Sequence, residues 1–308
     1  MLFSVLSLWT FTALTLGGSL GNHDADAVNA KTSLTFLYQN NLNESDSANH
    51  VGAILLDPME PQHAHEACQA IGESLLSRRT IEEHWDDFST LFAYLVYSCL
   101  EKQHEGAHID DGVVSLRSSR GRASYSHIPE FHVKLPVLCT QTSTGNDTSS
   151  PDKTMLVRSG GNSYVGYRDQ KSFRFLGIPY ANPAERFKYA ELYSGQSETI
   201  QTTEYGPQCL QAGGGSEDCL FLNIYTPYIP KDGDKKDLRP VLLWIYGGGF
   251  TGGSSSDPLT EGGNLASRED IVVVNFNYRL SNLGFFAVPG TDIKGNYGIS
   301  DQVVALEV

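Results

Sequence analysis

Positive charge is scarce in this sequence. Its 308 residues include 22 Lys and Arg against 36 Asp and Glu, which gives a formal net charge of −14 at pH 7. A surface of this charge repels phosphate backbones and anionic lipid headgroups, so we expect no nucleic-acid partner. The sequence also lacks internal repeats, and it has no uninterrupted apolar run of the roughly 20 residues that a membrane-spanning helix needs. We therefore expect no stable membrane span.

The apolar run at the N-terminus is short. Residues 1–21, MLFSVLSLWTFTALTLGGSLG, are an uncharged apolar segment followed by small residues. This pattern predicts a secretory signal peptide, with a signal anchor as the alternative. Two Asn-x-Ser/Thr sequons, at Asn43 and Asn146, lie in polar stretches and fit a glycosylated, extracellular protein.

Cysteine is infrequent, and its count is odd. The five residues are Cys68, Cys99, Cys139, Cys209 and Cys219. In an oxidising compartment most of them should pair, which leaves at least one unpaired or bridging outward. Cys209 and Cys219 close a short glycine-rich loop and are the first pair that we expect. The sequence leaves the pairing of the other three cysteines open.

The composition divides the chain at residues 140–153, which are almost all polar and read as a linker. Before it, residues 22–139 predict a small α+β region, with strands within 32–41 and 51–57 and a helix over 62–76. A longer helix is expected from Thr80, with Glu83 completing a capping box. Its apolar stripe should pack on a core and consists of Ile81, Trp85, Phe88, Phe92, Leu95 and Cys99.

Residues 154–308 change to a pattern dominated by strands. Strands are predicted within 164–169, 173–181, 219–227, 240–246 and 271–280, and a short helix over 298–308. The segments 240–246 and 271–280 are continuous apolar runs, typical of parallel strands that are covered on both faces. The predicted fold class of this part is therefore α/β.

A run of glycines follows one of these strands, in WIYGGGFTGG from Trp244 to Gly253. Gly247, Gly249 and Gly252 match the spacing of a dinucleotide-binding loop, but the residues that follow disfavour the helix that such a loop requires. No Gly-Lys-Ser/Thr follows, which excludes a phosphate-binding P-loop. A structural turn remains possible, and so does an oxyanion hole, in which glycine lets a substrate carbonyl approach backbone N–H groups.

Two histidine patterns raise the question of a metal. His104 and His108 frame an H-E-x-x-H motif, which on a helix could bind zinc, but the polar flanks and Gly106 favour a helix end in solvent. His63 and His65 are better explained as an exposed helix start. We expect no metal and no cofactor.

Five motifs occur in a characteristic order within residues 154–308: FLGIPYANP, SEDCLFLNIYTP, PVLLWIYGGGF, NFNYRLSNLGFFA and GNYGISDQVVALE. In order and spacing they resemble the type-B carboxylesterases, the family of cholinesterases and fungal lipases. The resemblance implies a secreted carboxylic-ester hydrolase with a Ser/His/acid mechanism, acting on a small-molecule ester or a lipid. It implies an α/β-hydrolase sheet that starts antiparallel and continues with parallel strands. It covers about the first third of that family's catalytic domain, so the sheet is expected to be incomplete.

The resemblance assigns roles to individual residues. It implies that Gly248 and Gly249 are the oxyanion-hole donors and that Cys209 and Cys219 form the family's first disulfide. It also implies two buried ion pairs, which are Arg186 with Glu217 and Arg279 with Asp301. The loop after Pro183 is shorter than the corresponding stretch of the family. The match of Arg186 to the family's arginine therefore depends on how this loop is aligned.

The sequence after the glycine loop lacks the motif of a serine nucleophile and has no histidine. In this fold the nucleophile, on a Gly-x-Ser-x-Gly turn, comes after the loop and precedes the acid and the histidine. No such turn occurs downstream of Gly253, and all nine histidines lie at or before His132. We therefore expect a truncated, N-terminal part of an esterase, aggregation-prone and inactive alone. The alternative is a non-catalytic binding protein on the same fold.

Overall fold

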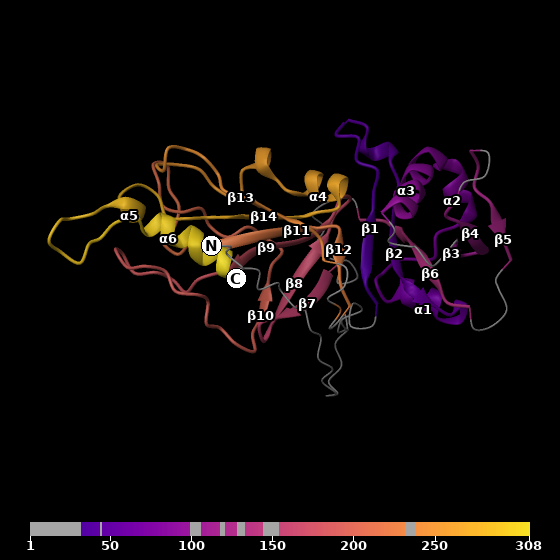
Figure 1. Cartoon of the computed structure of the whole chain (residues 1–308), viewed down its shortest axis with the longest axis horizontal. Coiled ribbons are helices and arrows are strands. Elements are labelled where there is room, and N and C mark those ends of the chain that lie inside the picture. Colours follow the sequence, from indigo (N-terminus) through magenta and orange to yellow (C-terminus); the bar gives the residue numbers. More distant parts are fainter. Residues whose placement is uncertain are drawn as a thin grey trace, which may run out of the picture.

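The computed structural model describes residues 32–43, 45–98, 106–117, 121–127, 133–143, 154–231, 234 and 238–308. Within these ranges the chain forms two sheets flanked by helices, a mixed α/β architecture (Figure 1). Among the helices of these ranges, none combines the length and the apolar composition that crossing a bilayer requires.

The first sheet is built almost entirely from the N-terminal region. Its strands, in spatial order, are β12 (Tyr228–Ile229), β1 (Leu34–Leu37), β2 (Gly52–Met59), β6 (Leu135–Gln141), β3 (Gly106–Ile109), β4 (Gly112–Ser115) and β5 (Tyr125–Ser126). All neighbours are antiparallel except β3 and β6. Strand β12 comes from the C-terminal half of the chain, so the first sheet is completed by a distant segment.

Three helices cover this sheet, as Figure 1 shows: α1 (Pro61–Gln69), α2 (Arg78–Glu83) and α3 (Trp85–Tyr97). Because side chains alternate across a strand, Ala53 and Leu55 of β2 face the core under α2 and α3, and Ile54 and Leu56 face the core that includes α1. The α+β arrangement expected for this region is present.

The helix boundaries differ from those predicted. Helix α1 ends at Gln69 rather than near residue 76, and Leu75 instead bridges to Cys139 of β6. The cap of α2 is Ser77, whose side chain accepts a hydrogen bond from the N–H of Thr80. The predicted capping box was wrong because the helix starts one turn earlier, and Glu83 pairs with Arg79 instead.

The expected long helix is also interrupted. His84, with φ −117° and ψ 38°, separates α2 from α3. The predicted apolar stripe nevertheless packs as expected. Its buried members are Ile81, Phe88, Phe92 and Leu95, whereas Cys99 lies outside the described residues.

The second sheet carries the glycine loop. Its spatial order is β10 (Thr199–Gln201), β8 (Asn162–Arg168), β9 (Phe173–Pro179), β11 (Phe221–Thr226), β14 (Val272–Phe276) and β13 (Val241–Trp244), with β7 (Thr154–Ser159) paired to β8. The pairs β8–β9, β9–β11 and β11–β14 are antiparallel, and β13 is parallel to β14. The short strand β10 at the other end of the sheet is parallel to β8. The predicted change from antiparallel to parallel strands is thus confirmed. The helices here are α4 (Gly263–Glu269), α5 (Ser281–Phe285) and α6 (Tyr297–Glu307).

Strand β13 forms one end of this sheet. Within the described ranges it pairs with β14 alone, and its residues Val241 and Trp244 are 54% and 44% exposed. The apolar sequence of this strand predicted burial on both faces, so the exposure is a correction. Exposed apolar side chains on an edge strand are a feature that favours aggregation in general.

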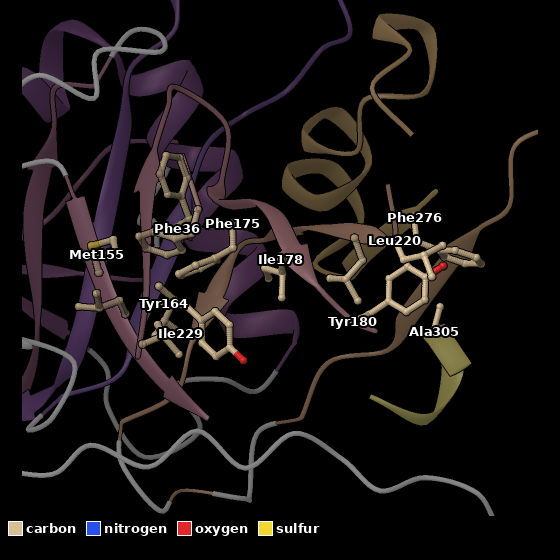
Figure 2. Close-up of a cluster of buried hydrophobic side chains, with 14 of the residues drawn as sticks. Phe36, Met155, Tyr164, Phe175, Ile178, Tyr180, Leu220, Ile229, Phe276 and Ala305 are labelled. Carbon is tan, nitrogen blue, oxygen red and sulfur yellow. The ribbon is translucent and has the colours of Figure 1, made fainter. Parts of the chain in front are cut away.

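The two sheets share one hydrophobic core. Figure 2 shows Phe36 of β1 beside Phe175 of β9, with Ile229 of β12 in the same cluster. The rings of Phe36 and Phe173 meet edge to face, with their centroids 5.4 Å apart. The N-terminal region is therefore packed against the C-terminal half through buried side chains.

A buried ion pair crosses the same junction. Arg168 of β8 and Glu73 are fully buried, and Arg168 Nη2 lies 2.8 Å from Glu73 Oε1. Glu73 also accepts hydrogen bonds from Thr140 and Thr142. Thr140 and Gln141 belong to β6, so these two residues of the predicted linker are structured. Residues 144–153 lie outside the described residues, and the domain boundary stays a prediction.

Candidate functional site

The glycine loop leaves the end of β13 and is exposed. Gly247, Gly248 and Gly249 are all on the surface, and Gly248 and Gly249 have φ values of +130° and +60°. A Cβ on Gly248 would lie 2.0 Å from the carbonyl oxygen of Gly252, so only glycine fits there. A Cβ on Gly249 would meet nothing within 4 Å.

The backbone N–H groups of Gly248 and Gly249 are available to a ligand. Within the described part of the chain, neither N–H donates a hydrogen bond, although the carbonyl of Gly248 accepts one from Thr251. Two adjacent, solvent-accessible donors at a strand end are a suitable site for a negatively charged oxygen.

Two stacked tyrosines, Tyr246 and Tyr278, lie buried next to the glycine loop. Tyr246 is buried immediately before the glycines and stacks on Tyr278 with centroids 4.5 Å apart. Gly253, at the return of the loop, lies against the Tyr246 ring so closely that a Cβ would come within 2.4 Å of it. Burial raises the pKa of Tyr278 and that of Tyr246, so both stay protonated and can donate hydrogen bonds.

A buried polar network holds the segment that follows the loop. Ser255 donates to Asn277 Oδ1 from both its N–H (2.9 Å) and its hydroxyl (3.0 Å). The Asn223 amide donates to Ser255 and to Asn275, and all four residues are buried. Sequence reasoning did not identify these residues. The signal that could have found them is the pair of asparagines inside the apolar run 271–280.

The far side of the loop is fixed by Phe250 and helix α5. Phe250 has a positive φ of 63°, uncommon for a bulky residue, and its carbonyl accepts from the N–H of Ser281 at 2.7 Å. Its ring packs on Phe285 with centroids 4.9 Å apart. Residue contacts on three sides therefore define the loop conformation.

Both disulfides of the described chain lie in buried positions. Cys209 and Cys219 are bonded, as predicted. Cys68 of α1 is bonded to Cys139 of β6, which answers the pairing that the sequence left open.

The two ion pairs named in the sequence form, in different environments. Arg279 binds Asp301 through Nε and Nη2 at 2.9 and 2.7 Å, and both side chains are buried. Its Nη1 donates to the carbonyl of Lys188, so Arg279 links the segment after β14 to α6 and to the loop after Pro183. Arg186 also pairs with Glu217, and this bond lowers the pKa of Glu217.

The expectation that this second pair is buried was wrong. The side chains of Arg186 and Glu217 are 61% and 37% exposed, because both belong to surface loops. The pair links the loop after Pro183 to the disulfide loop at the surface.

The alternative sites find no support in the described geometry. After Gly252 the chain continues without a helix to the single 3₁₀ turn Pro258–Thr260, so no helix N-terminus meets the third glycine of a dinucleotide motif. His63 and His65 are exposed on α1, and no group of three metal-binding side chains occurs among the described residues. His108 lies on strand β3 and is only 2% exposed, which corrects the expectation of a solvated helix end. Its partner His104 lies outside the described residues.

Comparison with known proteins identifies the second half of the chain. The family model described as "Carboxylesterase family" matches residues 159–308. Residues 159–308 belong to the carboxylesterase family. This segment contains the glycine loop, the Cys209–Cys219 disulfide and both ion pairs.

Individual carboxylesterase relatives match the same part. The chain is 36% identical to a bile salt-activated lipase of Homo sapiens over 159 residues, which cover 48% of this chain and 21% of that protein. It is 40% identical to a cholinesterase of Mus musculus, over 43% of this chain and 25% of that protein. A solved carboxylesterase of Geobacillus stearothermophilus is 37% identical over 49% of this chain and 33% of its own, with a TM-score of 0.45. The matched segment thus spans a third or less of these carboxylesterase relatives.

A single Gly-x-Ser-x-Gly does occur in the sequence, at Gly17 to Gly21. It lies in the N-terminal apolar run, outside the described residues and before the glycine loop rather than after it. In the carboxylesterase chain order it cannot be the nucleophile turn.

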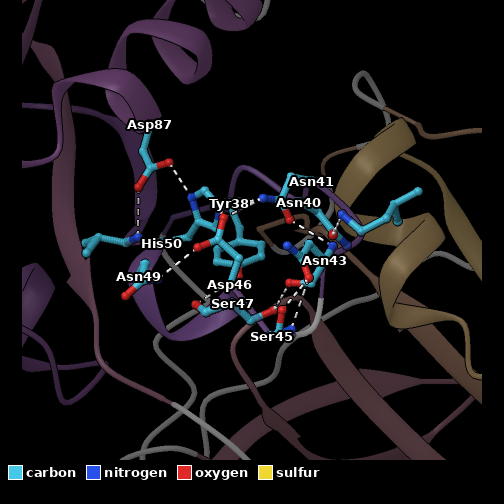
Figure 3. A network of polar contacts seen from close by, with 12 residues as sticks. Tyr38, Asn40, Asn41, Asn43, Ser45, Asp46, Ser47, Asn49, His50 and Asp87 are labelled. Carbon is cyan, nitrogen blue, oxygen red and sulfur yellow. Dashed lines mark hydrogen bonds and ion pairs between the residues drawn. The ribbon is translucent and has the colours of Figure 1, made fainter.

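One predicted glycosylation site can be located. Asn43 is exposed, and its Oδ1 accepts from the hydroxyl of Ser45 at 2.7 Å (Figure 3). The same loop is held by His50, whose Nδ1 lies 2.7 Å from Asp87 Oδ1 and whose Nε2 lies 3.2 Å from Asp46. Asn146 lies outside the described residues.

Proposed function

We propose that this chain supplies the oxyanion-binding part of a secreted carboxylic-ester hydrolase, with Gly248 and Gly249 as the donors. The observation that carries the proposal is the pair of exposed backbone N–H groups without hydrogen-bond partners in the described chain, at the end of a strand in the carboxylesterase segment. Such donors stabilise the negative oxygen that forms when a nucleophile attacks an ester carbonyl.

The chemistry divides between this chain and other residues. The N–H groups would hold the carbonyl oxygen of a small-molecule ester or a lipid while a serine attacks and a histidine moves the proton. Neither metal nor organic cofactor takes part in this reaction. Because no histidine and no Gly-x-Ser-x-Gly follow the glycine loop, we propose that these 308 residues alone do not turn over esters.

Secretion is part of the proposal. Two disulfides fit an oxidising compartment, and residues 1–21 have the composition of a signal peptide. Asn43 and Asn146 are the proposed glycan sites, and Asn43 is exposed. Peptide mass mapping of the protein secreted by a eukaryotic host should show the cleaved signal peptide and the glycans on Asn43 and Asn146. A mature chain that still begins at Met1 would contradict the signal peptide.

The test of the proposed reaction uses a fusion. The chain is joined at Val308 to the part of the Mus musculus cholinesterase that follows its matched segment, and hydrolysis of a short-chain p-nitrophenyl ester is measured. We expect the fusion to be active and to be inhibited by a serine-reactive organophosphate, and the chain alone to be inactive. Organophosphate-sensitive turnover by the chain alone would contradict the division of labour. A folded but inactive fusion would favour a non-catalytic binding protein.

A further inference from the structure

One side chain of the disulfide loop reaches across to the glycine loop. The amide of Gln211 binds both backbone groups of Gly253, 42 residues further along the chain. Its Nε2 donates to the Gly253 carbonyl at 2.9 Å, and its Oε1 accepts from the Gly253 N–H at 3.0 Å. The side chain therefore contacts the glycine loop as a neighbouring strand would.

Gln211 is itself held in place by its own loop. Its N–H and carbonyl both bond to Gly214, at 3.1 Å each. Nε2 also donates to the carbonyl of Cys209, at 3.1 Å. The Cys209–Cys219 disulfide closes this loop at its base. The amide is thus presented by a short, covalently closed segment with little freedom to move.

Gly253 connects Gln211 to the Gly248 and Gly249 N–H groups through close backbone contacts. The Gly252–Gly253 backbone lies directly against Gly247 and Gly248, since a Cβ on Gly253 would come within 2.6 Å of the Gly247 carbonyl. A Cβ on Gly248 would in turn meet the Gly252 carbonyl. A displacement of Gly253 must therefore move Gly248.

We propose that Gln211 is a positioning residue for the oxyanion donors, through which the Cys209–Cys219 loop sets the place of the Gly248 and Gly249 N–H groups. This inference rests on the proposed function, because it gives the two N–H groups a catalytic purpose. The contact between Gln211 and Gly253 stands independently of that purpose.

The decisive measurement is made on the full chain labelled with ¹⁵N-glycine. Gln211→Met keeps the length of the side chain and removes its hydrogen bonds. We expect hydrogen exchange at the Gly253 N–H to become about 10-fold faster or more, and the resonances of Gly248 and Gly249 to shift or broaden. Gly160, in a turn of the same sheet, should not change.

Gln208→Ala is the matched control. Gln208 belongs to the same segment, and its side chain makes no hydrogen bond within the described residues. Gln211→Glu separates the two halves of the contact, since it keeps an acceptor for the Gly253 N–H and loses both donors. It should leave Gly253 more protected than Gln211→Met does, while still shifting Gly248. If Gln211→Met does not fold, the shift of the Gly248 resonance in Gln211→Glu tests the proposal.

The proposal is overturned if the Gln211 variants leave the Gly248, Gly249 and Gly253 signals where Gln208→Ala leaves them. In the cholinesterase fusion, Gln211→Met should lower kcat about 10-fold or more with little change in KM, because positioning of a donor acts on the transition state. If Gln211→Met shifts the Gly248 and Gly249 resonances but leaves kcat of the fusion unchanged, Gln211 contacts the loop without positioning the donors, and the proposal is overturned. An inactive wild-type fusion would count against the proposed function, and the exchange data would still decide on the contact.

Discussion

Tyr246 and Tyr278 hold each other by reciprocal hydrogen bonds at the ends of two parallel strands. The hydroxyl of Tyr246 donates to the Tyr278 carbonyl and the hydroxyl of Tyr278 donates to the Tyr246 carbonyl, both at 3.0 Å. The hydroxyl of Tyr246 also accepts from the N–H of Tyr278, at 3.3 Å. The pair fixes the point from which the glycine loop departs.

The Tyr246 hydroxyl makes two hydrogen bonds to the backbone of Tyr278, whereas the Tyr278 hydroxyl makes one to the backbone of Tyr246. Loss of the Tyr246 hydroxyl should therefore destabilise the protein more than loss of the Tyr278 hydroxyl. Tyr246→Phe leaves two buried backbone groups of Tyr278 without partners and should cost about 1–3 kcal/mol. Tyr278→Phe removes one hydrogen bond and should cost less. Urea unfolding of both variants, compared at an unchanged m-value, measures the difference. An equal or reversed order would show that the hydroxyl of Tyr246 is not the main support.

Alanine at Gly249 should separate folding from catalysis. Gly249 and Gly160 have φ values of +60° and +58°, and a Cβ on either meets nothing within 4 Å. Alanine at each position should therefore cost a similar ~1–2 kcal/mol of stability. In the cholinesterase fusion, Gly249→Ala should also lower kcat by ~10²-fold or more, because its methyl group keeps the ester carbonyl from the N–H groups. Equal kcat values for the two variants would remove Gly249 from the oxyanion site.

The two ion pairs should respond very differently to loss of one partner. Asp301→Asn leaves the buried Arg279 guanidinium without a counter-charge and should destabilise the chain by about 3–5 kcal/mol. Glu217→Gln removes an exposed partner of Arg186 and should leave the unfolding midpoint unchanged. Chemical unfolding of both variants tests this. A comparable loss in the two would mean that burial does not decide the strength of these pairs.

His50 should stabilise the fold at acid pH. Burial lowers the pKa of His50, but the hydrogen bond and the charge of Asp87, together with Asp46, outweigh it and raise the pKa above its usual 6.5. The folded state then binds a proton more tightly than the unfolded state does. The resulting stability is fully present below pH 6.5 and is lost as the pH rises through the raised pKa. His50→Gln should abolish this part of the pH dependence of the unfolding free energy between pH 5.5 and 8.

His108 should have the opposite effect. Burial on strand β3 lowers its pKa below 6.5, and its Nε2 has no hydrogen-bond partner among the described residues. Its contribution is fully present above pH 6.5 and is lost as the pH falls from 6.5 towards the lowered pKa. His108→Gln should remove that acid-side loss while leaving the dependence due to His50. A slope of the same sign for both histidines would contradict these assignments.

Much of the carboxylesterase half could be predicted from the sequence. Strands β13 and β14 lie within the apolar runs 240–246 and 271–280, and the Cys209–Cys219 disulfide closes the short loop that suggested it. The partners of Arg279 and Arg186 were implied by the resemblance to the carboxylesterases. The N-terminal helices were less predictable. Ser77 and Thr80 are both good caps, and only packing decides which of them begins the helix.

The sequence by itself determined the local features, because hydrophobic periodicity, glycines and charged motifs act over a few residues. These are the strand pattern and the glycine loop at Gly248 and Gly249. The tertiary structure alone decided the contacts between distant segments: Gln211 on Gly253, Arg168 on Glu73, and Cys68 on Cys139. Such partners lie 42 to 95 residues apart, and only the tertiary packing of the elements that carry them brings them within bonding distance.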